Sequence, residues 1–128
     1  YEFGKNIGIA FQILDDILDV YATDDKFGKQ VGGDIISNKK TFLLLKTIEL
    51  ASVEQKKLLN QLLQSSNMTV KVEQVTKIYN ELNIKDIATS EANKYTAIAL
   101  THLEEIVSSE PKKKLLKQFA FHLLNREI

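Results

Sequence analysis

The sequence predicts an all-α protein of about six helices, and three observations support this. One proline and five glycines occur in 128 residues, and every glycine lies within the first 33. Apolar residues recur at intervals of three and four along most of the chain, and capping residues precede several of these runs. Sparse breakers combined with this period favour long helices over a sheet.

The first predicted helix covers residues 1 to about 23. Its apolar period is already running at Phe3 and Ile7, with no capping residue before it, so we expect the chain to start inside or just before a helix of a longer protein. Residues 24–38 are predicted as a polar, glycine-rich loop. A second helix over residues 38–51 is expected to have Asn38 as its cap. Its predicted inward residues are Phe42, Leu45 and Ile48.

Four more helices are predicted. Residues 52–65 open on a capping box formed by Ser52 and Gln55, Thr69 is the predicted cap of a helix that Asn83 closes, and Pro111 suits the first turn of the last helix. The remaining helix, which lies between Asn83 and Pro111, is predicted to run from about residue 84 to 108. The predicted apolar faces are Leu58, Leu59, Leu62 and Leu63; Val72, Val75, Ile78, Tyr79 and Leu82; Ala88, Ala92, Tyr95, Ala99, Leu103 and Ile106; and Leu115, Leu116, Phe119, Leu123 and Leu124.

The composition excludes several classes of protein. Seventeen basic and 17 acidic residues cancel, so nothing indicates a nucleic-acid-binding surface. Cysteine is absent, which excludes disulfides and thiolate metal sites and fits a reducing cytoplasm. No apolar run approaches the roughly 20 residues of a membrane span. We expect a soluble, cytoplasmic protein with no membrane span.

Three aspartates in the first helix form its most informative feature. Because successive helix residues turn by about 100°, Asp15, Asp16 and Asp19 share one face, and most of the remaining circumference is apolar. A helix of this kind is buried, and buried carboxylates one turn apart repel each other unless a cation lies between them. Oxygen ligands with no His or Cys nearby favour Mg²⁺, which completes its shell with water and phosphate oxygens. We therefore predict a metal-bridged phosphate ligand.

Two lysines downstream extend this prediction. Glycine-rich backbone around Lys29 would allow close approach to a phosphate, and Lys39 lies at the expected start of the second helix, where backbone amides favour anions. A loop lysine is also commonly an ordinary solvated side chain, and that interpretation stays open for both.

These residues resemble a known family. Phe11-Gln12, Asp15-Asp16-x-x-Asp19, Gly28-Lys29, Gly33-Asp34-Ile35 and Asn38-Lys39 occur in the order seen in the second aspartate-rich region of the trans-type polyprenyl diphosphate synthases, which include farnesyl, geranylgeranyl and longer-chain synthases. The resemblance is specific over residues 1 to about 46. It implies that residues 1–128 are the C-terminal portion of a single domain with the isoprenoid synthase helical fold.

The resemblance also implies a function. Family members are homodimers that join isopentenyl diphosphate to an allylic diphosphate by ionisation, condensation and loss of a proton, with Mg²⁺ stabilising the departing diphosphate. By position, the metal ligands would be Asp15, Asp16 and Asp19, with Asp15 the principal one. Lys29 and Lys39 would neutralise the allylic diphosphate. Phe11 and Gln12 would lie beside isopentenyl diphosphate.

One departure from the family pattern is clear, because the first aspartate-rich motif has no counterpart in these residues. We therefore expect the 128 residues alone to be inactive. Three alternatives remain: a class I terpene cyclase, against which Gly28-Lys29 and Asn38-Lys39 argue; a non-catalytic helical subunit of a heteromeric synthase; and a helical domain whose acidic stripe is merely solvated.

Overall fold

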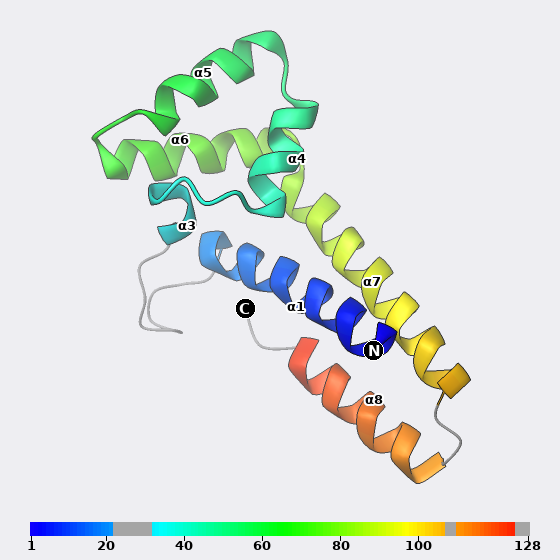
Figure 1. The fold of residues 1–128 in the computed structure, drawn as a ribbon. Helices are drawn as coiled ribbons and strands as arrows, with labels where there is room; N and C mark the ends of the chain where they lie inside the picture. The colour runs from blue at the N-terminus through cyan, green and yellow to red at the C-terminus, as the bar shows by residue number, and fades with distance from the viewer. Residues whose placement is uncertain (22–31, 107–109, 125–128) are drawn as a thin grey trace. The chain divides into compact units, whose positions relative to one another are not determined.

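The computed structural model describes residues 1–21, 32–106 and 110–124. Seven helices make up the regular structure of this part of the chain, and no strand occurs in it (Figure 1). Their bounds are α1 Glu2–Tyr21, α3 Gly33–Ile36, α4 Phe42–Leu50, α5 Val53–Leu63, α6 Met68–Glu81, α7 Ile84–Ile106 and α8 Glu110–Leu124. The predicted all-α class is confirmed. The element beyond the predicted six is α3, a single turn inside the stretch expected to be loop.

The chain divides into two compact units. Of the described residues, the first unit comprises 1–15, 89–106 and 110–124, and the second comprises 16–21 and 32–88. Helices α1 and α7 each contribute residues to both. None of the described helices is both long enough and apolar enough to cross a membrane.

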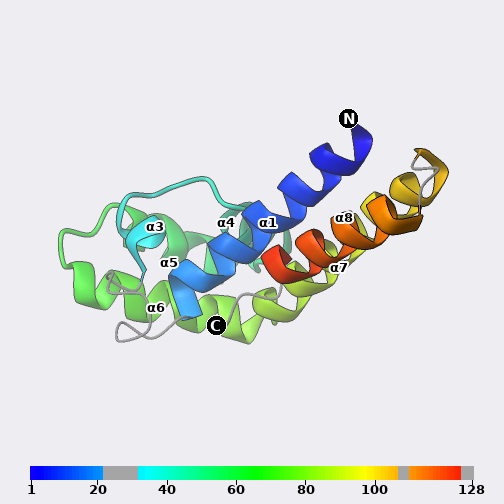
Figure 2. The ribbon, with the colours of Figure 1, turned by 90° about the horizontal axis from the view of Figure 1, so that it is seen from below.

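The first unit is held together by small and aliphatic side chains from three helices. Ile7 of α1, Ala99 of α7 and Ala120 of α8 form a buried cluster, and Phe3 packs against it. Figure 2 shows the N-terminal part of α1, the later part of α7 and α8 running side by side. Alanine has so little side chain that helices can approach closely, which explains why it supplies two of the three buried positions.

The face predicted for α8 was wrong. Leu115 and Phe119 are 66% and 62% exposed, whereas Ala120 is buried and Leu116 is half-buried. The buried side of α8 depends on how closely the neighbouring helices approach it. A small side chain such as Ala120 allows that approach, whereas a phenylalanine would keep the helices apart. The predicted inward position of Leu123 and Leu124 lies outside the described side chains.

In the second unit, α6 packs against α3, α4 and α5. Figure 1 shows α5 and α6 as neighbours joined by a short connection, with α3 beside the N-terminal half of α6. The buried apolar residues of this unit include Ile17 and Leu18 of α1, Leu43 and Leu44 of α4, Leu59 and Leu62 of α5, and Val75 and Ile78 of α6.

The predicted start and face of the second helix were also wrong. Asn38 adopts a left-handed conformation with φ 58°, and α4 begins only at Phe42, where the Thr41 hydroxyl accepts a hydrogen bond from the Leu44 amide. Because the helix buries Leu43, Leu44 and Thr47, two of the residues predicted to face inward lie on the outer side. These are Leu45 and Ile48, which are 51% and 43% exposed.

The later helix boundaries are closer to the predictions. The capping box of α5 is confirmed, since Ser52 and Gln55 exchange hydrogen bonds between side chain and backbone. The cap of α6 is Asn67 and not Thr69, because the Asn67 side chain accepts from the Val70 amide. Asn83, in a left-handed conformation with φ 55°, follows the end of α6 as predicted. Ala88, Ala92, Ala99 and Leu103 are buried along α7, as expected.

Candidate functional site

The carboxyl-terminal half of α1 carries the acidic residues on which the site is built. Asp16 and Asp19 are buried at 4% and 7% exposure, among the buried apolar residues Ile17, Leu18 and Val20. Asp15, on the same helix, is half-buried. Because a carboxylate that leaves water loses its hydration, buried aspartates must find donors or cations within the protein.

Asp19 finds its donors at the start of α3. One carboxylate oxygen accepts the backbone N–H of Asp34 at 2.8 Å, and the Asp19 carbonyl accepts the backbone N–H of Gly32 at 2.7 Å. Gly32 has φ 85°, and a Cβ at this position would lie 2.7 Å from a methyl group of Val72 on α6. Only glycine suits both the backbone conformation and the close approach. Asp19 and Gly32 together fix where α3 begins.

Lys39 lies between two carboxylates that are distant in sequence. Its Nζ is 3.8 Å from an oxygen of Asp16 and 4.0 Å from an oxygen of Asp34, and its side chain is 48% exposed. The backbone contributes as well, because the Lys39 amide donates to the Asp34 carbonyl at 2.9 Å. Both side-chain contacts are at the long end of the salt-bridge range, so the ammonium is held electrostatically and still reaches solvent.

A small cavity adjoins this cluster. Asp34, Lys39, Thr41 and Tyr79 supply its polar lining, and Val20, Leu44, Leu63 and Val75 are among its apolar lining residues. Its volume is ≈ 10 Å³, about what one water molecule needs.

The hydroxyl of Tyr79 remains protonated in this setting. Burial raises the pKa of Tyr79, the carboxylates of Asp34 and Asp16 raise it further, and a hydrogen bond with Thr41 acts in the opposite direction. At neutral pH the phenol is therefore a neutral hydrogen-bonding group beside two acidic side chains.

The donor set is of the kind that hard cations bind. Across the described residues, no three His, Cys, Asp or Glu side chains gather closely enough to hold a metal ion by themselves. Mg²⁺ does not require such a cage, since it takes one or two carboxylates and keeps water and phosphate oxygens in its remaining positions. The Asp16–Lys39–Asp34 cluster, which holds two carboxylates, fits that mode of binding.

The other predicted site residues lie outside the second unit or outside the described residues. Lys29 lies outside the described residues. Phe11 is half-buried and Gln12 exposed; together with Asp15 they belong to the first unit, whereas Asp16, Asp19 and Lys39 belong to the second. Of the predicted site residues, the structure therefore brings together those of the second unit only.

Three polar residues near the site were missed by the sequence reasoning, namely Thr41, Lys71 and Tyr79. The sequence pattern predicts Tyr79 on an apolar helix face and Thr41 inside the second helix. For Lys71 a signal existed, because it precedes Val75 and Ile78 by one and two helical turns, and so places a lysine within an apolar stripe.

Comparison with known proteins identifies the family. A family model described as polyprenyl synthetase matches residues 1–82, which is more than half of the chain. The chain belongs to the polyprenyl synthetase family. This confirms the resemblance carried by the aspartate motif and its downstream residues.

Synthases named for products of different chain length match the chain. It is 35% identical over 127 residues to the geranylgeranyl diphosphate synthase of Saccharolobus solfataricus, covering 98% of this chain and 38% of that protein. It is 29% identical over 115 residues to the octaprenyl diphosphate synthase of Haemophilus influenzae, covering 90% of this chain and 35% of that protein. The chain thus spans less than two fifths of these relatives.

The fold of this family member is likewise confirmed. The crystal structure of geranylgeranyl pyrophosphate synthetase from Pyrococcus horikoshii matches with a TM-score of 0.88 at 29% identity, covering 98% of this chain and 38% of that one. The described helices therefore belong to the all-α isoprenoid synthase fold.

Proposed function

We propose that the protein containing this chain is a trans-prenyltransferase that condenses isopentenyl diphosphate with an allylic diphosphate. The observation that carries the proposal is the position of Lys39, a half-exposed ammonium within about 4 Å of Asp16 and Asp34, beside the aspartate-rich end of α1. Family membership and the names of the matched relatives support it. In this proposal the chain forms the side of the substrate cavity that carries the second aspartate-rich motif.

The residues of the chain would act mainly through charge. Lys39 would turn from Asp16 and Asp34 to the allylic diphosphate, since a phosphate offers an exposed ammonium a stronger partner than two carboxylates near 4 Å. Asp15 would be the principal metal ligand, and Asp16 and Asp19 would orient metal-bound water. Mg²⁺, when bound, would stabilise the negative charge of the departing diphosphate.

The remaining predicted roles complete the proposal. Lys29 would neutralise the same diphosphate as Lys39, and Phe11 and Gln12 would lie beside isopentenyl diphosphate. The protein would act as a homodimer in the cytoplasm.

An assay of the intact protein tests the proposed reaction. With Mg²⁺, radiolabelled isopentenyl diphosphate and geranyl or farnesyl diphosphate, the label should enter a longer prenyl diphosphate, and a chelator should abolish the transfer. Ionisation of the allylic substrate without use of isopentenyl diphosphate would instead indicate a terpene cyclase. No turnover by the intact protein alone would indicate a non-catalytic subunit.

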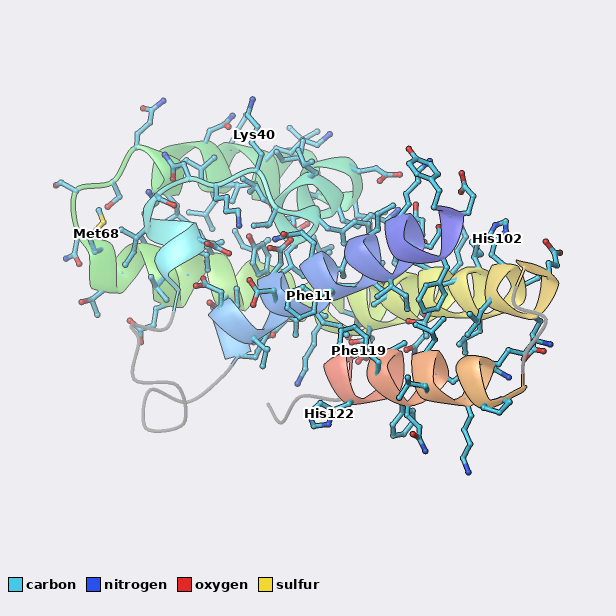
Figure 3. The ribbon with its side chains drawn as sticks, turned by 60° about the horizontal axis from the view of Figure 1, so that its bottom comes forward. Phe11, Lys40, Met68, His102, Phe119 and His122 are labelled. Carbon is cyan, nitrogen blue, oxygen red and sulfur yellow. The ribbon has the colours of Figure 1, made fainter. Side chains whose placement is uncertain are left out.

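Substitution of Lys39 tests the residue at the centre of the proposal. Lys39→Met should raise the KM for the allylic diphosphate by about 10- to 100-fold, the cost of losing one charge-assisted hydrogen bond. The matched control is Lys40→Met, because Lys40 is the adjacent lysine and its side chain extends outward (Figure 3). Equal KM values for the two variants would contradict the role of Lys39.

A further inference from the structure

A buried lysine lies behind the segment that carries Lys39. Lys71 of α6 is only 2% exposed, and its Nζ donates a hydrogen bond to the backbone carbonyl of Ile36 at 3.1 Å. Lysine is almost never buried to this extent unless its ammonium has a specific partner, because the charge loses its hydration. Lys71 takes no part in the chemistry proposed above, so its burial needs a separate explanation.

The partner of Lys71 is the carbonyl at the end of α3. Ile36 is the last residue of that helix. The last carbonyls of a helix accept no hydrogen bond from within the helix. An ammonium at this end also complements the carbonyl dipoles. The contact therefore stabilises the end of a helix of one turn, which is too short to be stable by itself.

Helix α6 and Asp19 together hold α3 at both ends. At its start, Asp19 binds the amides of Gly32 and Asp34, and Val72 of α6 lies against Gly32. At its end, Lys71 binds the Ile36 carbonyl. Neighbouring residues of α6 thus contact the two ends of α3.

The segment after α3 leads directly to the candidate site. The Lys39 amide donates to the Asp34 carbonyl, and the Asn38 side chain donates to the Leu63 carbonyl at 3.0 Å. The orientation of α3 therefore decides where the side chains of Asp34 and Lys39 lie with respect to Asp16.

We propose that Lys71 is a positioning residue whose ammonium, by holding the Ile36 carbonyl, fixes the turn that presents Asp34 and Lys39 to the ligand. The identity of that ligand as a diphosphate rests on the proposed function, but the positioning itself does not. Removal of the ammonium is expected to loosen residues 33–39 while leaving the packing of α5 on α6 in place.

Hydrogen exchange in the intact protein tests the positioning directly. In Lys71→Met, which keeps the length of the side chain but has no donor, the amides of Asp34, Ser37 and Lys39 should exchange about 10- to 100-fold faster, as expected for one lost hydrogen bond to a charged group. The amides of α5 should exchange as in the wild type. The matched control is Lys77→Met, an exposed lysine on the same helix.

The outcomes separate this proposal from the proposed function. Faster exchange confined to the three amides supports it, even in a protein without prenyltransferase activity. Unchanged exchange at these amides, or equal acceleration in α5, overturns it. If Lys71→Met does not fold, Lys71→Gln is measured in its place and judged by the same two results.

Kinetics provide a second readout if the prenyltransferase reaction is observed. Lys71→Met should raise the KM for the allylic diphosphate by about 10-fold, in the direction of the Lys39 variant, because Lys39 is less well placed. The KM for isopentenyl diphosphate should not change. A uniform loss of kcat with both KM values unchanged would contradict the positioning role.

Discussion

The two compact units use buried polar side chains in different ways. In the first unit, the buried side chain of Asn6 donates to the Glu2 carbonyl, one turn earlier in its own helix. In the second unit, Asp19 and Lys71 are buried and bind backbone groups 15 and 35 residues away. A bond within one turn stabilises a helix locally, whereas a bond between distant segments positions one segment against another. Long-range polar contacts of this kind mark the unit that contains the candidate site.

The charged residues of the two units follow the same division. In the first unit, Glu104 forms ion pairs with Lys113, at 3.4 Å, and with Lys117. The side chains of Glu104 and Lys117 are 48% and 45% exposed, and that of Lys113 is 15% exposed. In the second, Lys39 reaches the buried carboxylate of Asp16. Surface pairs contribute little because water and salt screen them, and a cation beside a buried carboxylate matters more.

The largest predicted effect compares Asp19 with Asn6. In the intact protein, Asp19→Ala should lower kcat of the proposed reaction by about 100-fold or more, since it removes both a charge near the leaving group and the acceptor of the Asp34 amide. Asn6→Ala should leave kcat near wild type, because alanine's helix propensity offsets one local hydrogen bond.

The isosteric variant Asp19→Asn separates the two contributions of Asp19. It keeps an oxygen that can accept the Asp34 amide but has no charge, so its stability should resemble the wild type while its kcat remains low. If Asp19→Ala and Asn6→Ala alter kcat equally, the distinction between the units has no functional meaning.

The next effect contrasts two glycines and is measured by denaturant unfolding of the intact protein. Gly32→Ala should lower the free energy of unfolding by about 2–3 kcal/mol, since the left-handed conformation alone costs roughly 1–2 kcal/mol and the new methyl group would also displace Val72. Gly4 lies within α1 with nothing within 4 Å of an added Cβ. Gly4→Ala should therefore raise the free energy of unfolding, by up to about 1 kcal/mol. Changes of the same sign would contradict this assignment of the two backbones.

A smaller effect tests the corrected cap of α6. Asn67→Ala should lower the free energy of unfolding by about 1 kcal/mol because the Val70 amide loses its acceptor. Thr69→Ala, two residues into the same helix, should change it by no more than about 0.5 kcal/mol. The reverse order would restore Thr69 as the cap.

The smallest effect concerns the ion pairs of Glu104 in the first unit. Hydrogen bonding and charge from Lys117, followed by Lys113, lower the pKa of Glu104. A carboxyl group whose pKa is lower in the folded protein stabilises the fold above its unfolded pKa, near 4.5, and that contribution disappears as the pH falls through the folded value. Glu104→Gln should thus be slightly less stable than wild type at pH 7 and equal to it at strongly acid pH. High salt should reduce the difference at pH 7, and a difference that persists in acid would exclude this cause.

The candidate site was predictable where one helix carries it. Asp15, Asp16 and Asp19 share a segment with a clear period, so their common face and the burial of Asp16 and Asp19 follow from helix geometry and the apolar neighbours. The predicted buried face of α4 was wrong because a shift of the face by one residue exchanges which of two equally apolar neighbours is buried. A helix that starts after Thr41 and buries Leu43, Leu44 and Thr47 leaves Leu45 and Ile48 outside, and Leu44 and Leu45 are equally apolar.

Local sequence was sufficient for the all-α class, the capping box of α5, the end of α6 and the family. Each of these depends on residues within a few turns of one another, and interactions within that range are encoded by spacing alone. Tertiary structure alone decided that Lys39 lies between Asp16 and Asp34, and that Lys71 closes the far end of α3. The first contact joins the segment after α3 to α1, and the second joins α3 to α6. No periodicity within any of these segments specifies how they approach one another.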